Sequence, residues 1–141
     1  MKQISLRDVE FLAFELAEQM LTFDEPIPDF STRFAGALES CLAVPFQKFG
    51  NKSPYPTLAA KAASLFYLMI KDHPFQNGNK RIAMTTLTVF LFLNNKWLNV
   101  SSMELYNLTV WVAQSPPAVK DAVVAAVEMF LKKFITNLRV Q

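Results

Sequence analysis

The sequence predicts an all-α protein, and three observations support this fold class. Apolar residues recur at the spacing of helical turns along most of the 141-residue chain. The chain has only three glycines, and its eight prolines fall between the apolar stretches. About six helical segments and one irregular segment account for nearly all of the length, which leaves no room for a sheet-based fold. A chain of this size fits one domain, residues 1–141, with one core.

Two amphipathic helices are expected before residue 45. In the first, 6–21, charged residues separate apolar residues at helical spacing, and Pro26 and Pro28 follow its end. Asp29 can cap the second, 30–42, whose apolar stripe continues until Pro45 stops it. Each helix has one apolar face, as expected for helices that pack on a common core.

The next two helices are more apolar and are expected to form the centre of the bundle. Thr57 can cap a helix over 58–72 that is rich in alanine and leucine and ends before His73 and Pro74. The helix over 81–94 is apolar nearly all the way round, which is typical of a helix surrounded by other helices. We therefore expect 81–94 to be the central buried helix.

Two further helices complete the bundle. Ser101 or Ser102 can cap a helix that runs to residue 114. The Ser-Pro-Pro sequence at 115–117 supplies a cap and a first-turn proline for a last helix, which is expected to end near residue 138.

The segment 45–56 lacks helical periodicity and is predicted to form a short β-hairpin flap. Gly50 and Asn51 suit its turn, and the aromatic residues Phe46, Phe49 and Tyr55 flank them. The alternative is a loop whose aromatic side chains pack onto the core.

Composition excludes several classes of function. Without a glycine-rich loop, P-loop and dinucleotide-binding motifs are absent. One cysteine and one histidine cannot build a disulfide framework or a Cys/His zinc site, and a lone Cys41 suits the cytoplasm. A net charge of +2 disfavours nucleic acid as a partner. The most apolar stretch, 82–93, is too short to span a membrane.

The segment 73–81, His-Pro-Phe-Gln-Asn-Gly-Asn-Lys-Arg, is where we expect the chemistry. A helix that starts after Gly78 would direct unpaired N–H groups at a bound anion. Arg81 could grip phosphate oxygens with its planar fork, and Lys80 would add a point charge. His73 could take a proton from an attacking hydroxyl, because histidine changes charge near neutral pH. The matching reaction transfers a phosphate-containing group to an alcohol.

The alternative for 73–81 is a plain helix-to-helix connection. Against it, cations at a helix N-terminus oppose the helix dipole, so Lys80 and Arg81 would cost stability there unless an anion is bound.

The segment resembles the signature of the Fic/Doc fold family, and within it the death-on-curing (Doc-like) toxins. Residues 38–40, 55–62 and 90–94 resemble the surroundings of that signature. The resemblance implies a Fic-fold helical bundle in which His73 is the general base and Phe75 a buried anchor. It implies ATP as the substrate nucleotide, whose phosphates would be held by Gly78, Asn79, Lys80 and Arg81. The two cations of this set, Lys80 and Arg81, would also be catalytic.

Two positions resemble the Doc-like branch rather than the adenylyltransferases. Those enzymes typically carry glycine at the place of Lys80 and arginine at the place of Met84. The resemblance thus implies a toxin of a toxin-antitoxin pair that transfers a phosphoryl group from ATP to a protein hydroxyl, with a translation elongation factor as the target. Adenylyl transfer (AMPylation) is the alternative.

Asn77 departs from the family pattern. It lies where the family usually has an acidic residue that holds Mg²⁺ against the phosphates. An amide oxygen can ligate a hard cation but lacks the charge of a carboxylate. A nucleotide- or protein-binding module without catalysis is therefore a further alternative.

The family resemblance also implies two protein contacts. A flap in this place aligns a target segment as an added strand, which here would involve Phe46, Phe49, Gly50 and Tyr55. No serine or threonine lies four residues before any glutamate, so the family's internal inhibitory motif is missing. We therefore expect restraint by a separate antitoxin on an apolar groove.

Overall fold

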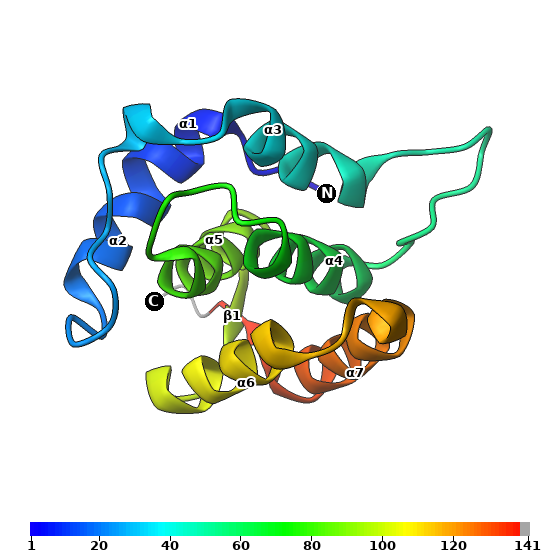
Figure 1. Cartoon of the computed structure of the whole chain (residues 1–141). Coiled ribbons are helices and arrows are strands. Elements are labelled where there is room, and N and C mark those ends of the chain that lie inside the picture. Colours follow the sequence, from blue (N-terminus) through cyan, green and yellow to red (C-terminus); the bar gives the residue numbers. More distant parts are fainter. Residues whose placement is uncertain (139–141) are drawn as a thin grey trace.

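The computed structural model describes residues 1–138, which form helices and one small antiparallel sheet (Figure 1). The helices are α1 (Leu6–Asp8), α2 (Phe14–Gln19), α3 (Ala35–Ala43), α4 (Leu58–Lys71), α5 (Asn79–Leu93), α6 (Ser102–Gln114) and α7 (Lys120–Phe134). A π-helical segment, Val9–Ala13, joins α1 to α2, and 3-10 turns occupy Phe30–Thr32, Val44–Phe46 and Pro117–Val119. Strands β1 (Lys96–Leu98) and β2 (Ile135–Asn137) form the sheet. The all-α class is confirmed.

Helices α4 and α5 form the centre of the molecule. They pack against each other, α4 also contacts α3, α6 and α7, and α5 contacts α2, α6 and β1. Figure 1 shows α1–α3 on one side of this pair and α6 and α7 on the other. Ten of the 15 residues of α5 are buried, so the prediction of a central buried helix is confirmed.

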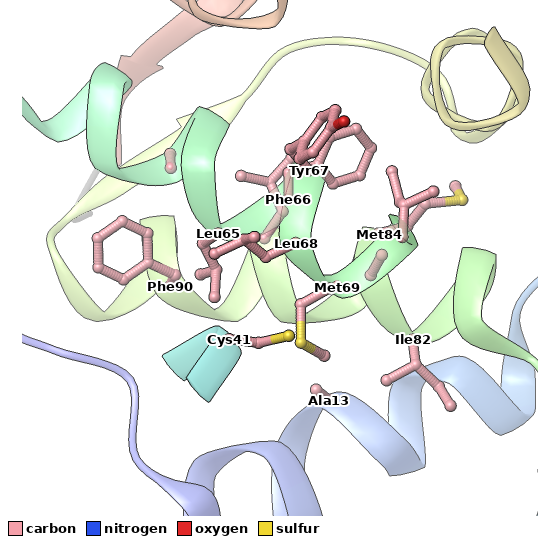
Figure 2. Close-up of a cluster of buried hydrophobic side chains, with 14 of the residues drawn as sticks. Ala13, Cys41, Leu65, Phe66, Tyr67, Leu68, Met69, Ile82, Met84 and Phe90 are labelled. Carbon is pink, nitrogen blue, oxygen red and sulfur yellow. The ribbon is translucent and has the colours of Figure 1, made fainter. Parts of the chain in front are cut away.

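The core lies mainly between α4 and its neighbours. Figure 2 shows Phe66 and Met69 of α4, Ile82 and Phe90 of α5, and Cys41 of α3 in one buried cluster. Alanines at 59, 60, 62 and 63 are all buried, and their small side chains let other helices approach the axis of α4 closely. None of the helices in residues 1–138 has the length and apolar character that a membrane crossing requires.

Three predicted caps are confirmed. The side chains of Asp29, Thr57 and Ser101 accept hydrogen bonds from backbone N–H groups two or three residues ahead, at 2.9, 3.1 and 3.1 Å. These bonds satisfy donors that a helix start leaves unpaired.

The prediction of one continuous helix over 30–42 is wrong. Asp29 caps only the 3-10 turn Phe30–Thr32, and the chain is extended at Arg33 and Phe34 before α3 begins. The backbone N–H of Phe34 donates to the carbonyl of Pro74 at 2.9 Å. A tertiary hydrogen bond to the loop after α4 has therefore replaced an intrahelical one.

The last helix also ends earlier than predicted. It stops at Phe134, because 135–137 pair with β1 in the register Lys96↔Asn137, Trp97↔Thr136 and Leu98↔Ile135. Asn95, with φ 61°, makes the turn that leads from α5 into β1. The sheet depends on residues about 40 apart in sequence, so local periodicity could not indicate it.

The predicted hairpin flap forms only a turn. Phe49 and Lys52 make a single antiparallel bridge, with N–H···O distances of 2.8 and 3.2 Å, around Gly50 at φ 67°. No strand pair extends from it in the described part of the chain, so the two-stranded flap is a wrong prediction. Figure 1 shows this segment, between α3 and α4, projecting from the helical body.

Candidate functional site

The loop between α4 and α5 carries His73 on an unusual backbone conformation. His73 has φ 47° and an exposed side chain. A non-glycine residue in this left-handed region is strained by about 1–2 kcal/mol. Such strain persists only where the surroundings impose the conformation, and it is common at functional sites.

Three contacts hold the loop in place. The carbonyl of Pro74 accepts the N–H of Phe34. The Phe75 side chain is only 1% exposed and packs against the ring of Phe14, with centroids 5.0 Å apart. The amide of Asn79 accepts the N–H of Phe75 at 3.0 Å and donates to its carbonyl at 2.8 Å. Phe75 is therefore the buried anchor that the resemblance implied, and Asn79 fixes the loop to the start of α5.

Gly78 precedes α5 and needs to be glycine for two reasons. Its φ of 73° is left-handed, and an added Cβ would lie 2.7 Å from Ile27 Cδ1 and 3.4 Å from the Pro26 carbonyl. The first N–H groups of α5 have no partner within the helix, and they carry the positive end of its dipole. This end of α5 therefore suits an anion.

Lys80, in the first turn of α5, forms an ion pair with Glu25. Their Nζ and Oε1 atoms are 3.5 Å apart, and the side chains are 26% and 49% exposed. An exposed pair of this kind contributes at most about 1 kcal/mol to stability. Lys80 thus remains accessible to a further anion.

Arg81 is buried, with 3% of its surface exposed. Its guanidinium donates to the carbonyls of Ala17 at 2.8 Å and Met20 at 2.7 Å, and also to the carbonyl of Glu25. The first two carbonyls lie at the C-terminal end of α2, where the helix dipole favours a cation. The dipole conflict expected from the sequence is therefore relieved inside the protein, without a bound anion, and a phosphate contact of Arg81 stays a prediction.

Asn77 lies beside the same glutamate. With its nitrogen toward Glu25, the Asn77 amide donates to Glu25 Oε2 at 3.1 Å and to the carbonyl of Gln76 at 3.0 Å. Glu25 is thus within reach of both Asn77 and Lys80. Sequence reasoning missed this residue, because it lies in the irregular segment after α2 and belongs to no motif. Residues 1–138 contain no group of three or more His, Cys, Asp or Glu side chains placed to hold a metal.

The aromatic residues predicted for the flap divide into two kinds. Phe46 and Tyr55 are partly buried against the core, and the Phe46 ring lies edge-on to Phe90 at 5.5 Å. Phe49, beside Gly50 at the tip, is 69% exposed. The core-packing alternative therefore describes Phe46 and Tyr55, and only the tip is free.

Lys61 of α4 holds the base of this segment. Its ammonium donates to the carbonyls of Pro45 and Tyr55 and to Ser53 Oγ at 3.1 Å, and it lies 5.7 Å from the centroid of the Phe46 ring. Burial, and then the charge of Lys48, lower the pKa of Lys61.

The structure places the flap and His73 at opposite ends of α4. The flap leads into Leu58, whereas His73 follows Lys71. The 14 residues of α4 span about 21 Å at 1.5 Å per residue. Asn77 and Lys80 are thus brought together with Glu25, whereas the flap aromatics lie at the other end of α4.

The comparisons with known proteins identify one family. The family model described as the Fic/DOC family matches residues 4–91, from the first helix to near the end of α5. No curated protein and no solved structure matches the chain. The matched region contains the whole loop at 73–81 and Glu25.

Proposed function

The chain belongs to the Fic/DOC family, and we propose that it transfers a phosphoryl group from ATP to a hydroxyl of a target protein. The family generally consists of transferases that use nucleotide substrates, typically ATP. The observation that carries the proposal is the exposed His73, held in a strained conformation in the short loop that leads into the anion-favouring end of α5.

In the proposed reaction, His73 takes the proton of the target hydroxyl. The hydroxyl oxygen forms a bond to the γ-phosphorus of ATP, and the bond from that phosphorus to the β,γ-bridging oxygen breaks. ADP leaves with the electron pair. The N–H groups at the start of α5 and the ammonium of Lys80 would stabilise the charge on the transferred group.

The choice of phosphoryl over adenylyl transfer rests on Lys80 and Met84. Met84 is fully buried in the core, so position 84 supplies no cation to a nucleotide. In the alternative, the hydroxyl attacks the α-phosphorus and pyrophosphate leaves. A binding module without catalysis is the second alternative, because Asn77 lacks the usual charge.

The proposed reaction uses a hard divalent cation such as Mg²⁺, which would neutralise charge on the phosphates of ATP. Oxygen ligands are those that Mg²⁺ prefers, and the Asn77 amide and the Glu25 carboxylate could supply them. In the structure the Asn77 amide instead donates to Glu25 Oε2.

The proposal extends to a toxin-antitoxin pair with a translation elongation factor as target. For the antitoxin, we propose an apolar groove of about 560 Å³ between α2, α5 and α6, whose lining includes Leu16, Val89, Phe92, Trp97 and Leu105. Leu16 is 40% exposed, so a charge there can be introduced at the surface. Leu16→Asp should leave transfer intact and abolish restraint by the antitoxin.

A dual-label experiment tests the transfer chemistry. The full-length protein is incubated with a bacterial lysate, Mg²⁺ or Mn²⁺, and ATP labelled at the α- or the γ-phosphate. Protein-bound γ-label alone supports phosphoryl transfer, and α-label indicates adenylyl transfer. If neither label is incorporated but calorimetry detects ATP binding, the alternative of a binding module without catalysis is correct. Absence of both labelling and binding would contradict every form of the proposal.

A further inference from the structure

Exposed apolar side chains gather around the apolar groove between α2, α5 and α6. Five large ones, each 40–55% exposed, line it: Phe11, Leu12, Leu16, Phe92 and Trp97. Single exposed apolar residues are common on soluble proteins, but a contiguous set around a hollow marks a surface that a partner covers. The volume of about 560 Å³ lies within the range of protein pockets that bind ligands, so the groove has room for side chains of that partner.

The charge around the groove is mainly negative. Its lining contains one carboxylate, that of Glu15, and no lysine or arginine. Arg7 lies beside one lining residue, with its guanidinium 5.8 Å from the centroid of the Phe11 ring. The segment 8–29, which contains α2, has seven aspartates and glutamates and no lysine or arginine. The groove therefore favours an apolar group that is flanked by cations.

The tip of the flap has the complementary composition. Residues 47–52 are all exposed, and Phe49, at 69% exposure, lies between Lys48 and Lys52 in the sequence. Phe49 and Lys52 are directly opposite each other in the antiparallel bridge, so their side chains lie on the same face of the turn. The sequence has no aspartate or glutamate in 40–71. Neither lysine forms an ion pair within the described part of the chain, so the tip presents an aromatic ring beside two uncompensated cations.

We propose that the flap tip of one molecule binds the apolar groove of a second copy, with Phe49 in the groove and Lys52 beside Glu15. Figure 1 shows the flap and α2 on opposite sides of the molecule, so the tip cannot enter the groove of its own chain. The contact is therefore head to tail, and each molecule offers one flap and one groove. Because only the tip enters the groove, the interface is small, and the association should be weak and depend on concentration. A groove that holds a second copy cannot hold the antitoxin at the same time.

Sedimentation equilibrium of the full chain tests the proposal without nucleotide or target, so its outcome is independent of the proposed transfer. The weight-average mass should rise above that of the monomer as the concentration increases. It should rise less steeply in about 0.5 M salt, because screening weakens the attraction between lysine and glutamate. Phe49→Ser removes the apolar group and should weaken the association at least about tenfold. The matched control Phe23→Ser changes a phenylalanine that is 71% exposed and lies outside the groove lining, so it should have no effect.

Exchange of the two charges identifies the surfaces that meet. Glu15→Lys and Lys52→Glu should each weaken the association, because each brings like charges together. The two substitutions combined in one chain should restore it, since the attraction is rebuilt with the signs reversed. Both positions are exposed, so the variants should fold, which thermal denaturation checks. A wild type that stays monomeric at every concentration, an association that Phe49→Ser leaves unchanged, or a double variant that associates no better than the single ones would overturn the proposal.

Discussion

Arg81 illustrates how the same residue can be interpreted differently before and after folding. In the sequence it belongs to a basic pair that suggests phosphate binding. In the structure its guanidinium connects the start of α5 to the end of α2 through backbone carbonyls. Its Nε has no hydrogen-bond partner within the described residues, so the side chain is not fully satisfied.

Arg81→Ala should therefore destabilise the protein. Two or more hydrogen bonds from a charged donor are lost and buried carbonyls become unpaired, which predicts a loss of about 3 kcal/mol in the free energy of unfolding. Urea denaturation measures it, and Arg81→Lys, which keeps the charge but not the fork, should lose less. A rise in melting temperature would instead show that the cation opposes the dipole of α5 without compensation. Nucleotide affinity of Arg81→Ala is interpretable only at temperatures where the variant is folded.

The role of His73 can be separated from its backbone strain. His73→Ala should abolish transfer while nucleotide affinity stays within a few fold, because the imidazole acts on the target hydroxyl and not on ATP. His73→Gly should be equally inactive but about 1 kcal/mol more stable than His73→Ala, because glycine adopts φ 47° without strain. Labelling assays, ATP calorimetry and thermal denaturation measure the three quantities. Growth arrest that survives His73→Ala would count against the catalytic role.

At the level of elements, α4 connects two loops of different character. The loop after its C-terminus is fixed by buried aromatic packing and by the amide of Asn79. The flap before its N-terminus is held at its base by the partly buried Phe46 and Tyr55 and by the ammonium of Lys61, and its tip is exposed. We expect the flap to be the more easily loosened of the two.

Lys61→Met tests this difference, because methionine retains an apolar stem but cannot donate. Amide hydrogen exchange in 47–53 should accelerate, whereas exchange in 73–81, at the far end of α4, should not change. Lys48→Met is the control, since Lys48 is exposed and makes none of these bonds. Equal acceleration in both loops would mean that α4 couples them.

For the whole molecule, Cys41 reports on the integrity of the core. Burial, and then the nearby Asp72 carboxylate, raise the pKa of the Cys41 thiol to about 12. The thiol is buried in the cluster of Figure 2 and has no exposure for a nucleophilic role. Its reaction with a thiol reagent at pH 8 should therefore require unfolding.

The raised pKa of Cys41 also predicts how stability depends on pH. Below about pH 7.5, one unit under the ordinary thiol pKa of about 8.5, the thiol is protonated in both the folded and the unfolded protein. As the pH rises from there toward 12, the unfolded thiol ionises first, which favours unfolding. The stability of the wild type relative to Cys41→Ala should thus fall between pH 8 and 10.5, as measured by denaturant unfolding. A constant difference would show that the thiol ionises equally in both states.

The sequence alone determined the features that depend on near neighbours. The spacing of apolar residues and the caps at Thr57 and Ser101 predicted α4 and α6 within one or two residues, because helices are stabilised by contacts three and four residues apart. The burial of α5 followed from its apolar circumference. The nine-residue segment at 73–81 was enough to indicate the family to which the chain belongs.

Only the tertiary structure decided which partners the polar groups of distant segments take. The Phe34 N–H bonds to the Pro74 carbonyl and breaks a predicted helix, and β2 replaces the predicted end of another. Glu25 comes to lie beside Asn77 and Lys80, more than 50 residues away in sequence. The physical reason is the same in each case. A buried or half-buried polar group must find a partner wherever the packed core leaves one, and local periodicity contains no information about where that is.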